Sequence, residues 1–146
     1  MRDQRSRKVW KWLVAVFIGT FVVFAAILAA AAWMHNQVQD ARTALQQYGD
    51  YLVAKKYEEA YVLRDSELQR VLSESDFEKA HESAASRNGR LETVVLESEY
   101  RVGDRHGMIV VINSRMIYER AENHFVVTMK KEENRWLVHD ARFSGN

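Results

Sequence analysis

The feature that most constrains this chain is the run from Trp12 to Asn36, which contains no Asp, Glu, Lys or Arg. A helix over residues 13–32 is about 30 Å long at about 1.5 Å per residue, which matches the hydrocarbon core of a bilayer. Tryptophan residues flank the run at Trp10, Trp12 and Trp33, and such rings settle at the headgroup level of a membrane. The run therefore predicts a transmembrane helix over residues 12–34.

Two other interpretations of this run are weighed against the anchor. A cleavable signal has an apolar core of about 7–15 residues, which is shorter than this one. The small residues at 29–32 nevertheless suit a signal peptidase, so cleavage there stays open as an alternative. A buried helix of a soluble domain is the third interpretation, but such a helix is rarely apolar on every face.

Charge is distributed unevenly along the chain. Residues 1–11 carry five basic side chains and one acidic side chain, whereas the remainder is mildly acidic. Because Lys and Arg are retained on the cytoplasmic side of a membrane, we expect a cytoplasmic tail over 1–11 and an extracytoplasmic domain over 35–146. The acidic domain lacks the clustered basic face that nucleic-acid binding needs. We therefore expect the lipid bilayer as a partner and expect no nucleic acid.

The first half of the soluble part has helical periodicity. Apolar residues recur at steps of three and four over 38–52, and similar spacing follows over 57–61 and 73–89. In the last of these segments Ser75 and Glu78 fit a capping box at a helix start. The pattern predicts three helices in this part of the chain.

After Gly89 the apolar residues alternate with period two, which is typical of strands. We expect consecutive strands with short polar connections, which favour an antiparallel meander. Helices followed by such a sheet give an α+β domain with the helices packed on one side of the sheet. The four expected strands cover residues 91–100, 107–119, 124–131 and 135–143.

Three short stretches carry a family resemblance: "YLVAKKYEEAYVL" at 51–63, "SESDFEKA" at 73–80 and "ENRWLVHDARFS" at 133–144. Their wording and order, over about residues 38–146, resemble the nuclear-transport-factor-two-like superfamily, also called the cystatin-like cone fold. The resemblance implies helices packed on a bent antiparallel sheet that forms a cone-shaped pocket. Ketosteroid isomerase-like and polyketide cyclase-like members place acids or histidines inside the cone, and this chain has no such pair to match.

Three polar residues are candidates for lining that pocket. Ser114 and Tyr118 share one face of the second strand with apolar residues, as in a pocket that is mostly apolar with a few polar groups. His139 is the third, because a histidine titrates near pH 6.5 and suits a general base, although a half-exposed strand histidine is the plainer interpretation. No spacing of histidines and acids matches a metal site, so we expect no metal or cofactor and assign no catalytic residue.

The opposite face of the second strand is the candidate interface. Its residues are too apolar for plain solvated surface, and such patches often mark association sites. They are Ile109, Val111, Asn113, Arg115 and Ile117. We expect a protein partner or a homodimer to bind there.

Two classes of function follow from these features. A single-span protein with a cone-fold outer domain resembles the inner-membrane assembly subunits of type IV secretion systems. We therefore expect a membrane-anchored, non-catalytic interaction or assembly module at the cell envelope. The alternative is an enzyme similar to ketosteroid isomerases or polyketide cyclases, or a binder of a small apolar ligand in the cone pocket.

Overall fold

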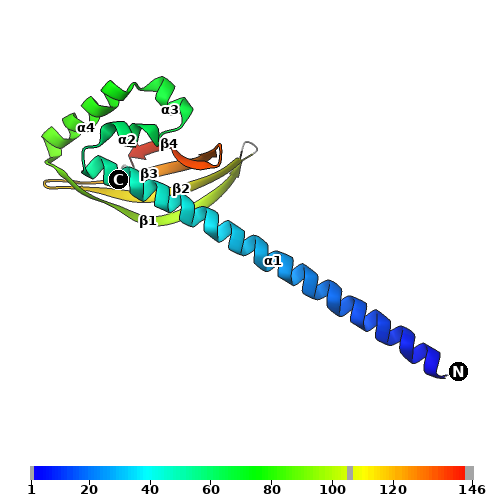
Figure 1. The fold of residues 1–146 in the computed structure, drawn as a ribbon. Helices are drawn as coiled ribbons and strands as arrows, with labels where there is room; N and C mark the ends of the chain where they lie inside the picture. Colours follow the sequence, from blue (N-terminus) through cyan, green and yellow to red (C-terminus); the bar gives the residue numbers. More distant parts are fainter. Residues whose placement is uncertain (1, 105–106, 144–146) are drawn as a thin grey trace. The chain divides into compact units, whose positions relative to one another are not determined.

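The computed structural model describes the backbone of residues 2–104 and 107–143, and the side chains of residues 10, 12–100 and 108–143. The chain forms two compact units, Met1–Gln37 and Val38–Asn146. Figure 1 shows the elements in chain order.

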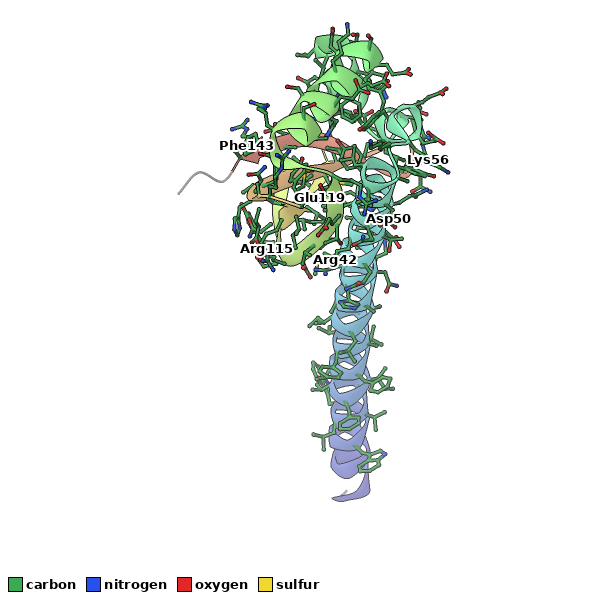
Figure 2. All side chains as sticks on the ribbon, turned by 90° about the vertical axis from the view of Figure 1, so that its left-hand side faces the viewer. Arg42, Asp50, Lys56, Arg115, Glu119 and Phe143 are labelled. Atoms are coloured by element: carbon green, nitrogen blue, oxygen red, sulfur yellow. The ribbon has the colours of Figure 1, made fainter. Side chains whose placement is uncertain are left out.

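The first unit consists of the N-terminal part of α1 (Arg2–Val53). Among the described residues this is the one helix long and apolar enough to cross a membrane, and every side chain over 12–36 is exposed. The sticks along this part of the helix in Figure 2 are almost entirely carbon. Thr20 is an exception, and its Oγ1 donates to the carbonyl of Val16 at 2.8 Å, so the hydroxyl is satisfied inside the helix. A long apolar N-terminal helix, compatible with a single membrane anchor, is confirmed.

The second unit begins with the last turns of α1, followed by α2 (Tyr57–Val62). In α1 the buried side chains recur at steps of three and four, as the sequence pattern predicts. They are Val38, Ala41, Leu45, Tyr48 and Leu52. This stripe packs into the apolar core of the domain together with Ala60 of α2.

A short helix, α3 (Ser66–Val71), is present where no helix was predicted. Asp65 is its N-cap, and the Oδ1 of Asp65 accepts from the backbone N–H of Leu68 at 2.9 Å. Six residues are too few to show a helical repeat in the sequence, so the capping carboxylate is the signal that marks this helix.

The cap of α4 (Glu74–Asn88) differs from the prediction. The N-cap is Ser73, whose Oγ accepts from the N–H of Asp76 at 3.2 Å and donates to the carboxylate of Asp76 at 2.7 Å. The predicted capping box at Ser75 and Glu78 is wrong by two residues. The observed pair Ser73–Asp76 and the predicted pair Ser75–Glu78 have the same spacing. Capping at Ser73 starts the helix two residues earlier and so lengthens it.

The described residues contain one antiparallel sheet of four strands in the order β1-β2-β3-β4, so the α+β prediction is confirmed. Its first hairpin is longer than predicted, because the pairing continues to Asp104 opposite Gly107. Irregularities in the β1–β2 and β3–β4 registers mark bulges, which bend strands. The last hairpin turns at Glu133 and Asn134, both with positive φ, as a type I′ turn requires. The strands are β1 (Leu91–Asp104), β2 (Gly107–Tyr118), β3 (Glu122–Glu132) and β4 (Arg135–Phe143).

Within the second unit the helices pack on one face of the sheet (Figure 1). The even-numbered residues of β2 face them and are buried from Val110 to Tyr118. At Gly49 the helix backbone comes close to the sheet, since an added Cβ would lie 2.9 Å from the Cβ of Val94. The absence of a side chain at Gly49 therefore allows α1 to lie against β1. This explains why a glycine, which destabilises a helix interior, is present at this position.

Candidate functional site

A cavity of about 420 Å³ lies between the helices and the sheet of the second unit. Its volume falls in the range of small-molecule sites, which is roughly 300–1,000 Å³. Most of its wall is apolar, with contributions from α3, α4 and the strands, including Leu68, Leu72, Phe77, Met116, Phe125 and Val127. This composition suits a small apolar molecule.

Two other hollows in the described part of the chain have similar volumes, of about 410 and 430 Å³. The wall of the first carries Glu58 and Glu59. The wall of the second carries the carboxylates of Glu74, Glu132 and Glu133 and also the guanidinium groups of Arg64 and Arg135. Walls so rich in charged groups are poor surroundings for an apolar ligand, so the cavity under α4 is the stronger candidate site.

Ser114 and Tyr118, two of the three candidate pocket residues, lie in the cavity wall. Ser114 is 2% exposed, and its Oγ is 3.5 Å from the carbonyl oxygen of Phe125, which is a long hydrogen bond. The hydroxyl of Tyr118 lies 3.8 Å from the sulfur of Met116, a weak acceptor. Both hydroxyls thus retain hydrogen-bonding capacity that a ligand in the cavity could use.

His139, the third candidate, is not in the wall of the cavity. Its Nδ1 pairs with the Oδ2 of Asp65, a carboxylate with no exposed surface. The other oxygen of Asp65 caps α3 at Leu68, and the N–H of Asp65 donates to the carbonyl of Val138 at 2.9 Å. Through its contact with Asp65, His139 therefore connects β4 to the N-terminus of α3.

The same pair belongs to a group of potential metal ligands. Asp65, Glu67 and His139 place ligand atoms within 4.8 Å of one another. Asp65 already uses both oxygens, one on α3 and one on His139, and Glu67 is exposed. A metal would have to replace the contact between Asp65 and His139, so we assign this group a structural role.

Arg64 is a residue of the cavity wall that was not predicted from the sequence. It is 7% exposed, and its Nη1 has no hydrogen-bond partner. Within the part of the chain that the structure describes, no carboxylate lies within 4.0 Å of its guanidinium group. The guanidinium carbon lies 4.9 Å from the centre of the Phe77 ring and 5.6 Å from that of Tyr61. These cation–π contacts are its main compensation for burial.

His81 of α4 is a second wall residue that was not predicted. Burial, with a smaller effect from the Arg64 charge, lowers the pKa of His81 to about 4, so its imidazole is neutral at pH 7. Its ring meets Phe77 edge-on at 4.5 Å and stacks on Tyr57 at 5.9 Å. His81 therefore extends the aromatic surface of the wall without adding charge.

Tyr48 of α1 is another polar residue of the wall, which also includes Arg87, Asn88, Asn123 and Asp140. Burial raises the pKa of its phenol to about 12, while the Arg64 charge opposes that shift. The Tyr48 hydroxyl therefore keeps its proton at neutral pH and can donate a hydrogen bond.

The candidate interface on the other face of β2 is partly occupied by contacts within the sheet. Arg115 pairs with Glu97 at 2.5 Å and with Glu122 at 2.7 Å, and Figure 2 shows Arg115 on the opposite side of the strands from α4. Asn113 donates to the Oγ of Ser98 at 2.8 Å. Val111 is only 7% exposed, whereas Ile109 and Ile117 are half-buried.

Neither a family model, nor a curated protein, nor a solved structure matches this chain. Function is therefore argued from the geometry of the cavity and its wall.

Proposed function

We propose that this chain is a single-pass membrane protein whose domain, residues 38–146, binds a small and largely apolar molecule. The observation that carries the proposal is the cavity of about 420 Å³ with a mostly apolar wall. Helices on one face of a four-stranded antiparallel meander also agree with the resemblance to the nuclear-transport-factor-two-like superfamily. We propose membership of that superfamily on the same grounds.

The proposed activity is binding without chemical change of the ligand. An enzyme that moves a proton needs a base within reach of the substrate, commonly oriented by a second group. Two histidine–carboxylate pairs occur among the described residues, His139 with Asp65 and His124 with Glu122, and neither lines the cavity. The histidine that does line it, His81, has aromatic rings as its neighbours. These contacts favour a binder over the isomerase-like or cyclase-like alternative.

The membrane helix would hold such a binding domain at the membrane surface. Molecules with apolar bodies concentrate in and near a bilayer, and a tether keeps the domain at that surface. The basic residues at 1–11 favour a domain outside the cytoplasm. We propose that the domain captures its ligand at the extracytoplasmic surface of the membrane.

Filling the cavity tests the proposal. The full-length protein is purified in detergent from its own membranes and examined by native mass spectrometry for a bound small molecule. Ala84 lies in the cavity wall on α4, so Ala84→Phe should displace the ligand. The neighbouring Ser83 is exposed and does not line the cavity, so Ser83→Phe is the matched control.

We expect the wild type and Ser83→Phe to carry the same adduct and Ala84→Phe to lose it. An adduct that survives Ala84→Phe, or the absence of any adduct from all three proteins, contradicts cavity binding.

The interaction module remains a second candidate. The observation in its favour is the half-buried apolar pair Ile109 and Ile117 on the sheet face opposite the helices. Because Val111 is buried, a charge there would damage the fold, and Ile117→Lys is the cleaner variant. If a homodimer forms through this face, Ile117→Lys should make the protein monomeric in sedimentation experiments. An unchanged sedimentation coefficient argues against this interface.

A further inference from the structure

We propose that the ligand of this cavity is an amphiphile with a carboxylate head, and that Arg64 binds the carboxylate. This inference rests on the proposed function and adds the chemical class of the ligand to it. It starts from a cation that is 7% exposed and whose Nη1 has no partner.

A purely structural arginine would look different. Such a residue usually donates to backbone carbonyls or to a carboxylate, because a buried cation without these partners destabilises the fold. Asp65, the next residue in the chain, is a buried carboxylate, yet it pairs with His139 and not with Arg64. Arginine also remains charged at neutral pH, so it cannot avoid the cost by losing a proton.

The guanidinium group is held in place before any ligand arrives. Phe77 and Tyr61 lie within cation–π distance of it, and the Tyr61 hydroxyl is fixed by a hydrogen bond to the carbonyl of Leu72 at 2.9 Å. The planar fork of arginine matches the two oxygens of a carboxylate. A positioned fork in an apolar wall is therefore suited to one specific anion.

The other charged groups in the wall favour a single negative charge on the ligand. Asp140 is already paired with Arg142 at 2.5 Å, and Arg87 lies at an exposed position. A phosphate dianion would bring a second charge into an apolar cavity with one buried cation to meet it. A carboxylate brings one charge, and Tyr48 and Ser114 offer hydroxyls in the same cavity wall.

The test compares matched ten-carbon probes on the full-length protein in lipid nanodiscs. The probes are decanoate, decanol, decylamine and decyl phosphate, each labelled with ¹³C at C1, and NMR titration gives the bound fraction. The variants are Arg64→Met, which removes the charge at similar length, and Arg64→Lys, which keeps the charge but loses the fork. Arg70→Met is the control, because Arg70 of α3 is an exposed cation that does not line the cavity.

We expect decanoate to bind about tenfold to a hundredfold more tightly than decanol, the ratio that a charge-assisted hydrogen bond gives. Arg64→Met should lower decanoate affinity to the level of decanol while leaving decanol unchanged, and Arg64→Lys should fall between. Arg70→Met should bind decanoate almost as the wild type does. Without ligand, Arg64→Met should melt at the same temperature as the wild type or higher, because it removes a buried charge whose Nη1 has no hydrogen-bond partner.

The possible failures are distinguishable. Equal affinity for decanoate, decanol and decylamine overturns the carboxylate inference and leaves apolar binding in place. Tighter binding of decyl phosphate than of decanoate overturns the choice of anion. A marked fall in the melting temperature of Arg64→Met with unchanged decanoate affinity shows a structural arginine. Binding of none of the probes removes both the inference and the proposed function.

Discussion

Trp136 joins the last strand to the core of the domain. It is 6% exposed and belongs to the same apolar cluster as Val138 and Met129. Trp136→Ala should therefore lower the free energy of unfolding by about 3–5 kcal/mol. Tyr100 of β1 is 53% exposed, and Tyr100→Ala serves as the control with a much smaller effect. Chemical denaturation of the full chain in detergent measures both, and a loss below about 1 kcal/mol for Trp136→Ala would contradict its burial.

His81 should make the domain sensitive to acid. Burial and the Arg64 charge lower the pKa of His81 to about 4 in the folded protein, whereas an unfolded histidine titrates near 6.5. Between these values the unfolded chain binds more protons, so stability falls as pH falls through this window. The expected loss between pH 7 and pH 4 is roughly 2–3 kcal/mol.

The variant His81→Phe keeps a ring beside Phe77 and removes the titrating group. Its unfolding free energy should fall less than that of the wild type between pH 7 and pH 4, by about the amount assigned to His81. An identical acid dependence in the two proteins would show that His81 is not buried in its neutral form.

The candidate site was predictable only where a local repeat decides which way a residue faces. Ser114 and Tyr118 follow from the period-two pattern of β2, which places them on the helix side. Arg64 could not be predicted from a sequence repeat. It stands out because its buried Nη1 has no hydrogen-bond partner, and only the three-dimensional structure shows this. The contact of His139 with Asp65 could not be predicted for a similar reason, because the two residues are 74 positions apart in the chain.

Among the helices and strands, the long ones could be predicted from the sequence, whereas the short helix α3 could not. The repeat over 38–52 and the four strands are long enough to show their periods. The six residues of α3 are not, and the start of α4 depended on choosing between two serine-acid pairs of equal spacing. Strand ends were also underestimated, because pairing with β2 extends β1 to Asp104 beyond its apolar stretch.

Gly49 tests how closely α1 packs on β1. A methyl group at this position would lie 2.9 Å from the Cβ of Val94, so Gly49→Ala should destabilise the domain by about 1–3 kcal/mol although alanine is the better helix former. Gly19 of the same helix has nothing within 4 Å of an added Cβ, so Gly19→Ala is the matched control. Thermal unfolding of the two variants in detergent should separate them. Equal melting temperatures would contradict the close approach.

At the scale of the whole molecule, the basic residues at 1–11 and the apolar run after them predict one membrane crossing with the C-terminus outside the cytoplasm. A C-terminal alkaline-phosphatase fusion should be active, and a fluorescent fusion that matures only in the cytoplasm should be dark. The reverse pattern would place the domain inside. A mature N-terminus near residue 33 would show instead that the apolar run is cleaved.

Methyl NMR of the full-length protein in nanodiscs tests cavity binding most directly, because it reports which face of the sheet a ligand touches. Decanol is the ligand of choice, since a neutral molecule tests the cavity independently of Arg64. The methyl signals of Leu68, Met116 and Val127, which line the cavity, should shift on titration, whereas those of Ile109 and Ile117 on the opposite face should not. Shifts at Ile109 and Ile117 alone, or at none of these methyl groups, would contradict a ligand-binding cavity.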